Sequence, residues 1–274
     1  MIRGLYTAAS GMIAEQRRES MLSNNLNNID TPGYKQDVGT LRTFPEMLVS
    51  RISGGMPVTA SVGNVASGVY QDETIPDFSQ GTLTQTGQPT DVAIVTNQLP
   101  VNPTTGAQDG ALLFSVRTAQ GDVRYTRNGH FTVSASGRLV DDSGDNVLDA
   151  AGNPLQLNTS NVQIAGDGTV TDAATGATLG RIGVSYAADT NQLVKEGDGL
   201  YRWQGGGALP AAGGQSGVSY TLKQGELEGS NVSAEDTMTD MMESYRSFEA
   251  NQKVLQILDS TLNEAVNQVG RLNS

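Results

Sequence analysis

The sequence predicts an α+β protein in which long N- and C-terminal helices pair as a coiled coil around the two ends of an inserted, mainly antiparallel β domain. Three observations predict this fold. Between Gly229 and Gly270 the chain has neither glycine nor proline, although it contains 33 glycines. The first 29 residues repeat apolar side chains at helical spacing. The region between these segments alternates short apolar runs with glycine turns.

The C-terminal segment begins at Ser233, which forms a capping box with Asp236, and Gly270 is placed to end the helix in a left-handed conformation. Its apolar residues recur at intervals of three and four, as in a coiled-coil seam. A helix of this length needs a long partner to cover such a stripe. The predicted seam residues are Met241, Tyr245, Phe248, Leu255, Leu258, Leu262, Val266 and Val269.

The N-terminal segment, residues 2 to about 29, is the predicted partner. Gly4 and Gly11 each lower its intrinsic helicity by about 1 kcal/mol, which is tolerable where another helix approaches closely. Pro32 and Gly33 end it in a turn. The predicted seam residues of this helix are Ile2, Leu5, Tyr6, Ala9, Met12 and Ile13.

These patterns predict three parts. Residues 1–35 plus 233–274 form a helical assembly domain, 36–80 plus 218–232 an extended or β connector, and 81–217 the antiparallel β domain, a sandwich or open barrel. Within the connector, residues 44–52 share a face and predict a helical turn. Within the β domain, strands recur from Asp91 onward, and Asn128-Gly129 predicts a hairpin.

Composition excludes several functional classes. The net charge of −12 argues against binding to nucleic acid or to an anionic membrane surface. The absence of cysteine excludes disulfides and thiolate chemistry. No apolar stretch is long enough for membrane insertion, and the N-terminus lacks a convincing cleaved signal peptide.

No residue pattern indicates catalysis, a metal or a cofactor. We expect His130 to be an exposed strand-end residue, and Asp141, Asp142 and Asp145 to be solvated turn residues, since the calcium-loop pattern is absent. Gly205–Gly207 lacks the lysine of a phosphate-binding loop. A glycosidase carboxylate pair has no sequence signature, so a cell-wall hydrolase stays an open alternative.

The sequence resembles the bacterial flagellar basal-body rod protein family, the flagellar hook-basal body proteins, most of all their distal-rod branch. The resemblance extends over nearly the whole chain. It depends on residues 23–35 (SNNLNNIDTPGYK), 79–86 (SQGTLTQT), 91–94 (DVAI), 125–129 (YTRNG), 227–232 (LEGSNV) and 245–251 (YRSFEAN). The assembly-signature residues are Asn24, Asn25, Leu26, Asn28, Thr31, Pro32, Gly33 and Tyr34.

The resemblance implies a structural, non-enzymatic subunit that self-assembles into a tubular drive shaft through its terminal helices. Its implied partners are further copies in a helical homopolymer, other rod and hook proteins, and the flagellar type III export apparatus. The implied location is the extracytoplasmic part of the basal body. The alternatives are a flagellar hook or hook-junction protein and, from another class, an exported cell-wall glycan-binding protein or hydrolase.

Overall fold

The computed structural model describes residues 2–44, 47–53, 56–65, 68–101 and 110–271. The chain divides into two compact units. Unit 1 comprises residues 1–27, 37–75 and 233–274, and unit 2 comprises residues 28–36 and 76–232. Each unit is therefore assembled from segments that are distant in the sequence.

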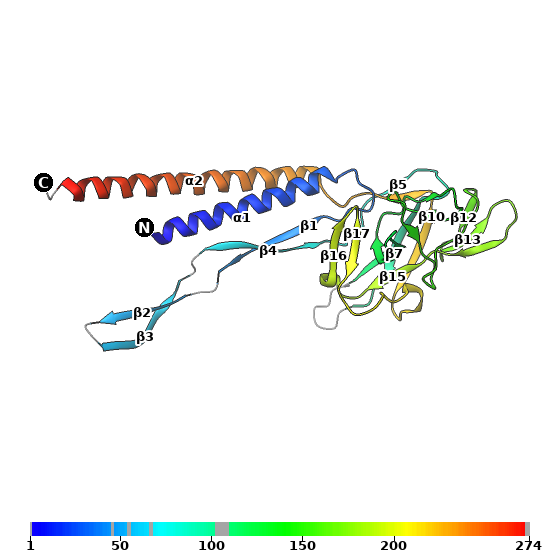
Figure 1. The fold of residues 1–274 in the computed structure, drawn as a ribbon, viewed down its shortest axis with the longest axis horizontal. Coiled ribbons are helices and arrows are strands. Elements are labelled where there is room, and N and C mark those ends of the chain that lie inside the picture. The colour runs from blue at the N-terminus through cyan, green and yellow to red at the C-terminus, as the bar shows by residue number, and fades with distance from the viewer. Residues whose placement is uncertain (1, 45–46, 54–55, 66–67, 102–109, 272–274) are drawn as a thin grey trace. The chain divides into compact units, whose positions relative to one another are not determined.

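Unit 1 contains the two long helices, α1 (Ile2–Asn27) and α2 (Ala234–Arg271), which lie side by side and antiparallel (Figure 1). The Oγ atom of Ser233 accepts a hydrogen bond from the backbone N–H of Asp236 at 3.4 Å, so the predicted start of α2 is confirmed. The predicted left-handed ending at Gly270 is wrong, because α2 continues through this residue. Glycine adopts right-handed helical dihedral angles as well as left-handed ones.

The part of unit 1 that the structure describes also contains four strands. β1 (Asp37–Thr43) pairs with β4 (Val69–Pro76), and β2 (Met47–Ser53) pairs antiparallel with β3 (Met56–Val65). The helical turn predicted for residues 44–52 is wrong, since Met47–Ser53 is a strand. A helix of two turns is marginal by itself in water, whereas pairing with β3 gives the backbone groups partners.

Unit 2 is mainly antiparallel, as predicted. Its strands are β5 (Leu83–Gln85), β6 (Val92–Gln98), β7 (Ala111–Arg117), β8 (Val123–Thr126), β9 (Thr132–Val133), β10 (Leu139–Val140), β11 (Asn146–Val147), β12 (Val162–Ile164), β13 (Thr169–Asp172), β14 (Thr178–Arg181), β15 (Val184–Ala187), β16 (Leu193–Gly197), β17 (Leu200–Trp203), β18 (Ser219–Gln224) and β19 (Glu226–Glu228). The largest sheet has the order β16-β17-β8-β7-β11-β10-β9, with β15 also beside β7. The smaller groups are β12-β13-β14, β18-β6 and β19-β5.

Strand β7 is buried on both faces. Leu112, Phe114 and Val116 point into the larger apolar cluster, where Phe114 contacts Phe131 edge to face at 5.1 Å between ring centroids. Leu113 points into a second cluster on the opposite face. A strand covered on both faces has a nearly continuous run of apolar residues instead of an alternating one. Residues 111–116 (ALLFSV) have this continuous pattern.

Five turns of unit 2 share one geometry. Each spans five residues, and the first residue exchanges backbone hydrogen bonds with the fourth and the fifth. The fourth residue is always glycine, with φ between 78° and 95°. This is a type I turn followed by a left-handed residue, and it explains how glycine-rich sequence supports short hairpins. The turns span residues 118–122, 134–138, 141–145, 149–153 and 165–169.

The predicted strand connections of unit 2 differ from the structure in two places. The hairpin predicted at Asn128-Gly129 is wrong, because β8 pairs with β7 and β17 while β9 pairs with β10. Strands β16 and β17, which pair with each other, were not among the predicted strands. Their short mixed sequences, LVKEG and LYRW, carry little alternation, so pairing partners decide their structure.

The shared turn geometry predicts that Gly144→Ala lowers the free energy of unfolding by about 1 kcal/mol, because alanine resists the left-handed conformation. Gly144 has φ of 85° and open space around its Cα, so no clash contributes. Gly206→Ala is the matched control. Gly206 also has open space around its Cα, but its φ is not positive, so alanine fits its backbone conformation. Denaturant unfolding of both variants checks this, and an equal loss in both would contradict the turn assignment.

Candidate assembly site

Three distant segments of unit 2 meet at the carboxylate of Glu228. Lys35 Nζ donates to Glu228 Oε1 at 2.6 Å, and Arg127 Nε donates to Glu228 Oε2 at 2.6 Å. The backbone N–H of Gly81 also donates to Oε1, at 2.9 Å. The side chains of Lys35, Arg127 and Glu228 are 0%, 4% and 1% exposed. We call these three residues the charge cluster.

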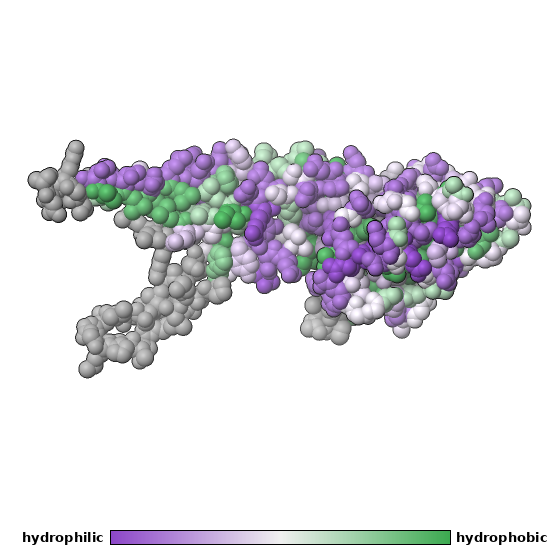
Figure 2. All heavy atoms as spheres, viewed as in Figure 1, coloured by the Kyte–Doolittle hydropathy of each residue, from purple (hydrophilic) through white to green (hydrophobic). Residues whose placement is uncertain are grey.

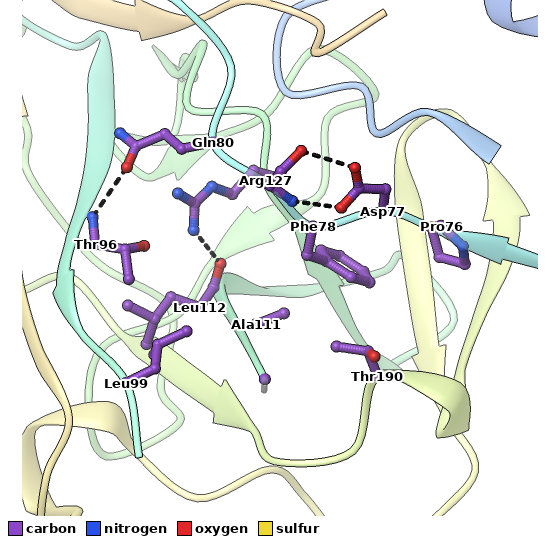
Figure 3. Close-up of a pocket in the computed structure, with 12 residues that line it drawn as sticks. Pro76, Asp77, Phe78, Gln80, Thr96, Leu99, Ala111, Leu112, Arg127 and Thr190 are labelled. Carbon is purple, nitrogen blue, oxygen red and sulfur yellow. Dashed lines mark hydrogen bonds between the residues drawn. The ribbon is translucent and has the colours of Figure 1, made fainter. Parts of the chain in front are cut away.

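The two cations of the charge cluster use their remaining donors on backbone carbonyls. Arg127 donates from Nη1 to the carbonyl of Leu112 at 2.6 Å and from Nη2 to that of Ile94 at 2.9 Å. Figure 3 shows the guanidinium directed at the start of β7. Lys35 donates to the carbonyl of Ser79 at 2.6 Å. Each buried charge therefore has hydrogen-bond partners, as burial requires.

Burial and charge act on the cluster in opposite directions. Burial alone would raise the pKa of Glu228, but Arg127 and Lys35 together outweigh it, so the pKa lies below the ordinary glutamate range. Burial lowers the pKa of Lys35, and attraction to Glu228 acts against that change while Arg127 adds to it. Glu228 is the group that keeps two like charges together in an apolar interior.

Glycines allow the backbones around the charge cluster to approach closely. A Cβ at Gly33, which has φ of 69°, would lie 2.4 Å from the backbone nitrogen of Asn128. A Cβ at Gly129 would lie 1.7 Å from the carbonyl oxygen of Val92. Asn128-Gly129 is therefore a place of backbone contact rather than a hairpin turn.

The N-terminal signature is divided between the units. Asn25, at the end of α1, is fully buried, and its side-chain amide exchanges two hydrogen bonds of 2.9 Å with the backbone of Asp37. In unit 2, Lys195 Nζ lies 3.7 Å from the ring centroid of Tyr34. Among the signature residues, Asn25, Gly33 and Tyr34 are buried, Asn24 is exposed, and Leu26, Asn28, Thr31 and Pro32 are half-buried.

A second amide fixes the C-terminal signature. The backbone N–H of Gln36 donates to Asn231 Oδ1 at 2.7 Å, and Asn231 Nδ2 donates to the carbonyl of Asp77 at 2.9 Å. The carbonyl of Glu228 accepts from the N–H of Gly33 at 2.7 Å. Four short motifs thus lie close together in unit 2: TPGYK (31–35), SQG (79–81), TRNG (126–129) and LEGSN (227–231).

The helix pair of unit 1 is in contact along much of α1. A Cβ at Gly4 would lie 3.2 Å from Leu258, and a Cβ at Gly11 would lie 2.8 Å from Asn251. The expected close approach at both glycines is confirmed, although side chains rather than backbone of α2 meet them. Further along, Ser244 Oγ donates to Glu15 Oε2 at 2.8 Å.

The predicted seam residues fall into three groups. Leu5, Ala9, Met12, Met241, Phe248, Leu255, Leu258 and Leu262 are half-buried. Tyr6, Ile13, Tyr245 and Val266 are more than half exposed in a single chain. The side chains of Ile2 and Val269 lie outside the described residues.

Sequence reasoning missed the small and polar residues of the helix contact. Ala8, Ala14, Thr237 and Ser244 are buried, with exposed fractions of 5% or less. Positions 237, 241, 244, 248, 251, 255, 258 and 262 follow one another at intervals of four and three, the spacing of a packed stripe. A pattern built from apolar residues alone leaves out Thr237, Ser244 and Asn251. The four-and-three spacing includes these positions when it is continued through polar residues.

Two expectations about polar side chains are wrong. His130 is half-buried rather than exposed, and its Nδ1 lies 2.8 Å from Asp91 Oδ1. Asp141 and Asp145 are buried rather than solvated, because the Asp141 carboxylate accepts the backbone N–H groups of Ser143 and Asp145 within a turn. Burial raises the pKa of Asp141 despite these bonds. Asp142 is exposed, as expected, with its side chain 54% accessible.

Unit 2 contains a cavity lined by described residues. It measures about 460 Å³ and lies beside Arg127 (Figure 3). Its lining contributes one carboxylate, Asp77, whose oxygens accept hydrogen bonds from the N–H and hydroxyl of Ser79. Within the described ranges, no group of three His, Cys, Asp or Glu residues could hold a metal ion. No described helix is both long and apolar enough to cross a membrane.

Three family models match the chain. The model described as "Flagella basal body rod protein" matches residues 5–35, "Flagellar hook protein FlgE/F/G D1 domain" matches 107–172, and "Flagellar basal body rod FlgEFG protein C-terminal" matches 223–268. The first and third cover most of α1 and α2 and include both signatures, with the cluster residues Lys35 and Glu228.

Individual relatives match over their whole length. The flagellar hook-basal body complex protein FlhO of Bacillus subtilis is 43% identical, over 99% of this chain and 100% of the relative. The flagellar basal-body rod protein FlgG of the same organism is 33% identical, over 97% and 99%. The flagellar basal-body rod protein FlgF of Caulobacter vibrioides is 30% identical, over 100% of both chains.

The charge cluster predicts that Glu228→Gln lowers the free energy of unfolding of unit 2 by about 3–5 kcal/mol, because Lys35 and Arg127 lose their shared counter-charge. Lys35→Met should cost less, since Glu228 keeps Arg127. Denaturant unfolding of both variants checks the order of the two losses. Equal or reversed losses would contradict the central role of Glu228.

The same cluster predicts a pH dependence. Because the pKa of Glu228 is lowered in the folded state, its contribution is complete above about pH 4.3, the ordinary glutamate value, and disappears as the pH falls through the folded-state pKa. The stability difference between the natural protein and Glu228→Gln should therefore shrink in acid. Unfolding midpoints measured from pH 7 down to pH 3 check this, and a constant difference would contradict it.

Proposed function

Because the chain belongs to the flagellar basal-body rod and hook-basal body protein family, we propose that copies of it pack through their terminal helices into a tubular segment of the rod. The protein is a structural component of the flagellar basal body. The role proposed for it is mechanical, that of one wall element in a hollow drive shaft, and requires no catalytic activity.

The observation that carries this proposal is the uncovered apolar surface of the helix pair. Tyr6 and Ile13 of α1 are 70% and 54% exposed, and Ile257 and Val266 of α2 are 61% and 70% exposed. Figure 2 shows hydrophobic residues gathered along the helices toward the start of α1 and the end of α2. Apolar faces of this kind mark surfaces that another protein covers.

The lengths of the two helices support the same proposal. Gly4, near the start of α1, lies beside Leu258, and α2 continues to Arg271. The last turns of α2 therefore extend past α1 and need neighbours from other chains. Contacts that do not close on themselves produce an open helical stack of subunits, which is the geometry of a tube.

We propose that the antiparallel helix pair is a coiled coil and that residues 1–35 plus 233–274 act as the assembly domain. Contacts of α1 with positions 244, 251 and 258 of α2 recur every seven residues, which is the period of a coiled-coil seam. The boundaries 36–80 plus 218–232 for a connector and 81–217 for a β domain are further parts of this proposal.

The proposed position is the distal rod, with hook or hook-junction placement as the second candidate. The relatives that match at full length are named both as rod and as hook-basal body proteins, which keeps both positions open to test. We also propose that the protein passes through the flagellar export apparatus. A cell-wall hydrolase gains no support from the cavity in unit 2, whose lining offers a single carboxylate.

The seam predicts that Leu255→Asp abolishes rod assembly and swimming, because it places a charge on the half-buried face of α2. Gln256→Asp is the matched control, since the neighbouring residue is exposed and the added charge is the same. Swimming in soft agar and electron microscopy of isolated basal bodies provide the measurements. Normal rods with Leu255→Asp, or equal loss with Gln256→Asp, would exclude this face as the assembly surface.

The uncovered helices predict a second, independent result. In dilute monomer, amide exchange should be faster in α1 and α2 (Ile2–Asn27 and Ala234–Arg271) than in β7, because the helix pair lacks the neighbours that cover it in the tube. Hydrogen-exchange mass spectrometry at several concentrations checks this. Uniform protection in a strict monomer would show that the helices are complete without neighbouring copies.

A further inference from the structure

Helix α2 carries a second stripe beside the one that faces α1. Met238, Met242 and Tyr245 each follow by one residue a position of the stripe that faces α1, namely 237, 241 and 244. One residue turns an α-helix by about 100°, so these three side chains lie on one flank of α2 instead of against α1. They are 51%, 57% and 53% exposed. We call these three residues the α2 flank.

Helix α1 carries an uncovered face of its own. Tyr6 and Ile13 are 70% and 54% exposed. Each follows by two residues a glycine that lies against α2, Gly4 in one case and Gly11 in the other. Two residues turn the helix by about 200°, so Tyr6 and Ile13 lie on the side of α1 that is opposite to α2. We call these two residues the α1 outer face.

The two surfaces have the same spacing. Tyr6 and Ile13 are seven residues apart, and so are Met238 and Tyr245, a separation of about 10.5 Å along a helix. In a tube whose copies all point the same way, α1 of one copy runs antiparallel to α2 of the next, as the two helices do within one chain (Figure 1). Antiparallel contact places Tyr6 opposite Tyr245. It also places Ile13 opposite Met238.

The side chains between these positions are complementary in size. Met242 lies between Met238 and Tyr245 on the α2 flank, and in antiparallel contact it lies opposite residues 9 and 10 of α1, which are alanine and serine. A flexible methionine fills the space above small residues and adapts to neighbouring aromatic rings. Tyrosine and methionine are also enriched where protein surfaces meet.

Charges at one end of the two surfaces are complementary as well. Arg17 follows Ile13 by four residues, about one turn further along α1, and is exposed. Glu235 precedes Met238 by three residues and is also exposed. Antiparallel contact that sets Ile13 opposite Met238 therefore brings Arg17 opposite Glu235. Opposite charges at the rim of an interface favour one register over others.

We infer that the α1 outer face of one copy docks antiparallel on the α2 flank of a second copy, with Ile13 against Met238 and Arg17 paired with Glu235. The inference rests on the proposed assembly and names the two surfaces that meet in it. Because the two surfaces differ, each copy uses one of them toward each neighbour, and the contact does not close on itself.

The contact also sets a stagger between neighbouring copies. Within one chain, Ile13 is level with about position 248 of α2, because Gly11 lies beside Asn251 and Glu15 bonds to Ser244. The position that Ile13 meets in the second copy is about ten residues nearer the start of α2. The second copy is therefore displaced by roughly 15 Å along the helices, which produces a rising stack instead of a flat ring.

The chain has no cysteine, so disulfide crosslinking tests the contact directly. Cells that carry the full chain with Ile13→Cys and Met238→Cys are oxidised, and the products are separated on a denaturing gel without reductant. We expect a ladder of dimers, trimers and longer species, because each copy offers one cysteine to each of two neighbours. Within one chain the two positions are about ten residues apart along the helices, beyond the reach of a disulfide.

Ile13→Cys combined with Glu243→Cys is the matched control. Glu243 is exposed on the same helix, but it lies about 140° around α2 from Met238, so no ladder is expected. Equal ladders in both double variants would show contact without a defined face. Dimers alone would show a symmetric contact, and rods without any ladder would show that other faces meet. Each of these three results overturns the inference.

A charge exchange covers the case in which the cysteine variants do not assemble. Arg17→Glu and Glu235→Arg should each reduce spreading in soft agar, because like charges then face each other. The double variant should restore spreading toward that of the natural chain. A double variant that stays impaired, or two single variants that both swim normally, would overturn the pairing.

Leu255→Asp separates this inference from the proposed function. Rods that form without the expected ladder and without charge rescue overturn only the two docking faces. Rods that persist with Leu255→Asp contradict the proposed assembly through the helix pair itself. The expected combination is a ladder specific to positions 13 and 238 that disappears when Leu255→Asp is added.

Discussion

One buried carboxylate, that of Glu228, decides how unit 2 closes. Lys35 and Arg127 both lie inside the protein, and neither could stay charged there without an anion between them. The three residues are separated by about a hundred residues each along the chain. Because both cations bond to the same carboxylate, the end of the N-terminal signature, the middle of the β region and the C-terminal signature lie together at Glu228.

This closure joins the segment that follows α1 to the segment that leads toward α2. Residues 28–36, which follow α1, and the residues up to Val232 both belong to unit 2, where Gln36 bonds to Asn231 and Gly33 bonds to Glu228. Glycines leave room for these backbones to touch. The parts of the family motifs that lie in unit 2, residues 31–35, 79–81, 126–129 and 227–231, thus pack against one another within that unit.

Side-chain amides take the place of backbone partners at several positions. Asn25 bonds both backbone groups of Asp37, while Gln80 and Gln224 each bond a strand edge. Such bonds satisfy buried or exposed peptide groups without extending a sheet.

The sequence by itself determined the elements whose signals are local: two long helices, the Ser233 cap and most strands of unit 2. Periodicity and turn chemistry act over a few residues, so they can be read directly. Only the tertiary structure decided the charge cluster, the burial of Asp141, the β2 strand and the polar contact of Ser244 with Glu15. These depend on partners far away in the chain, and an isolated glutamate or serine carries no sign of the partner that will bury it.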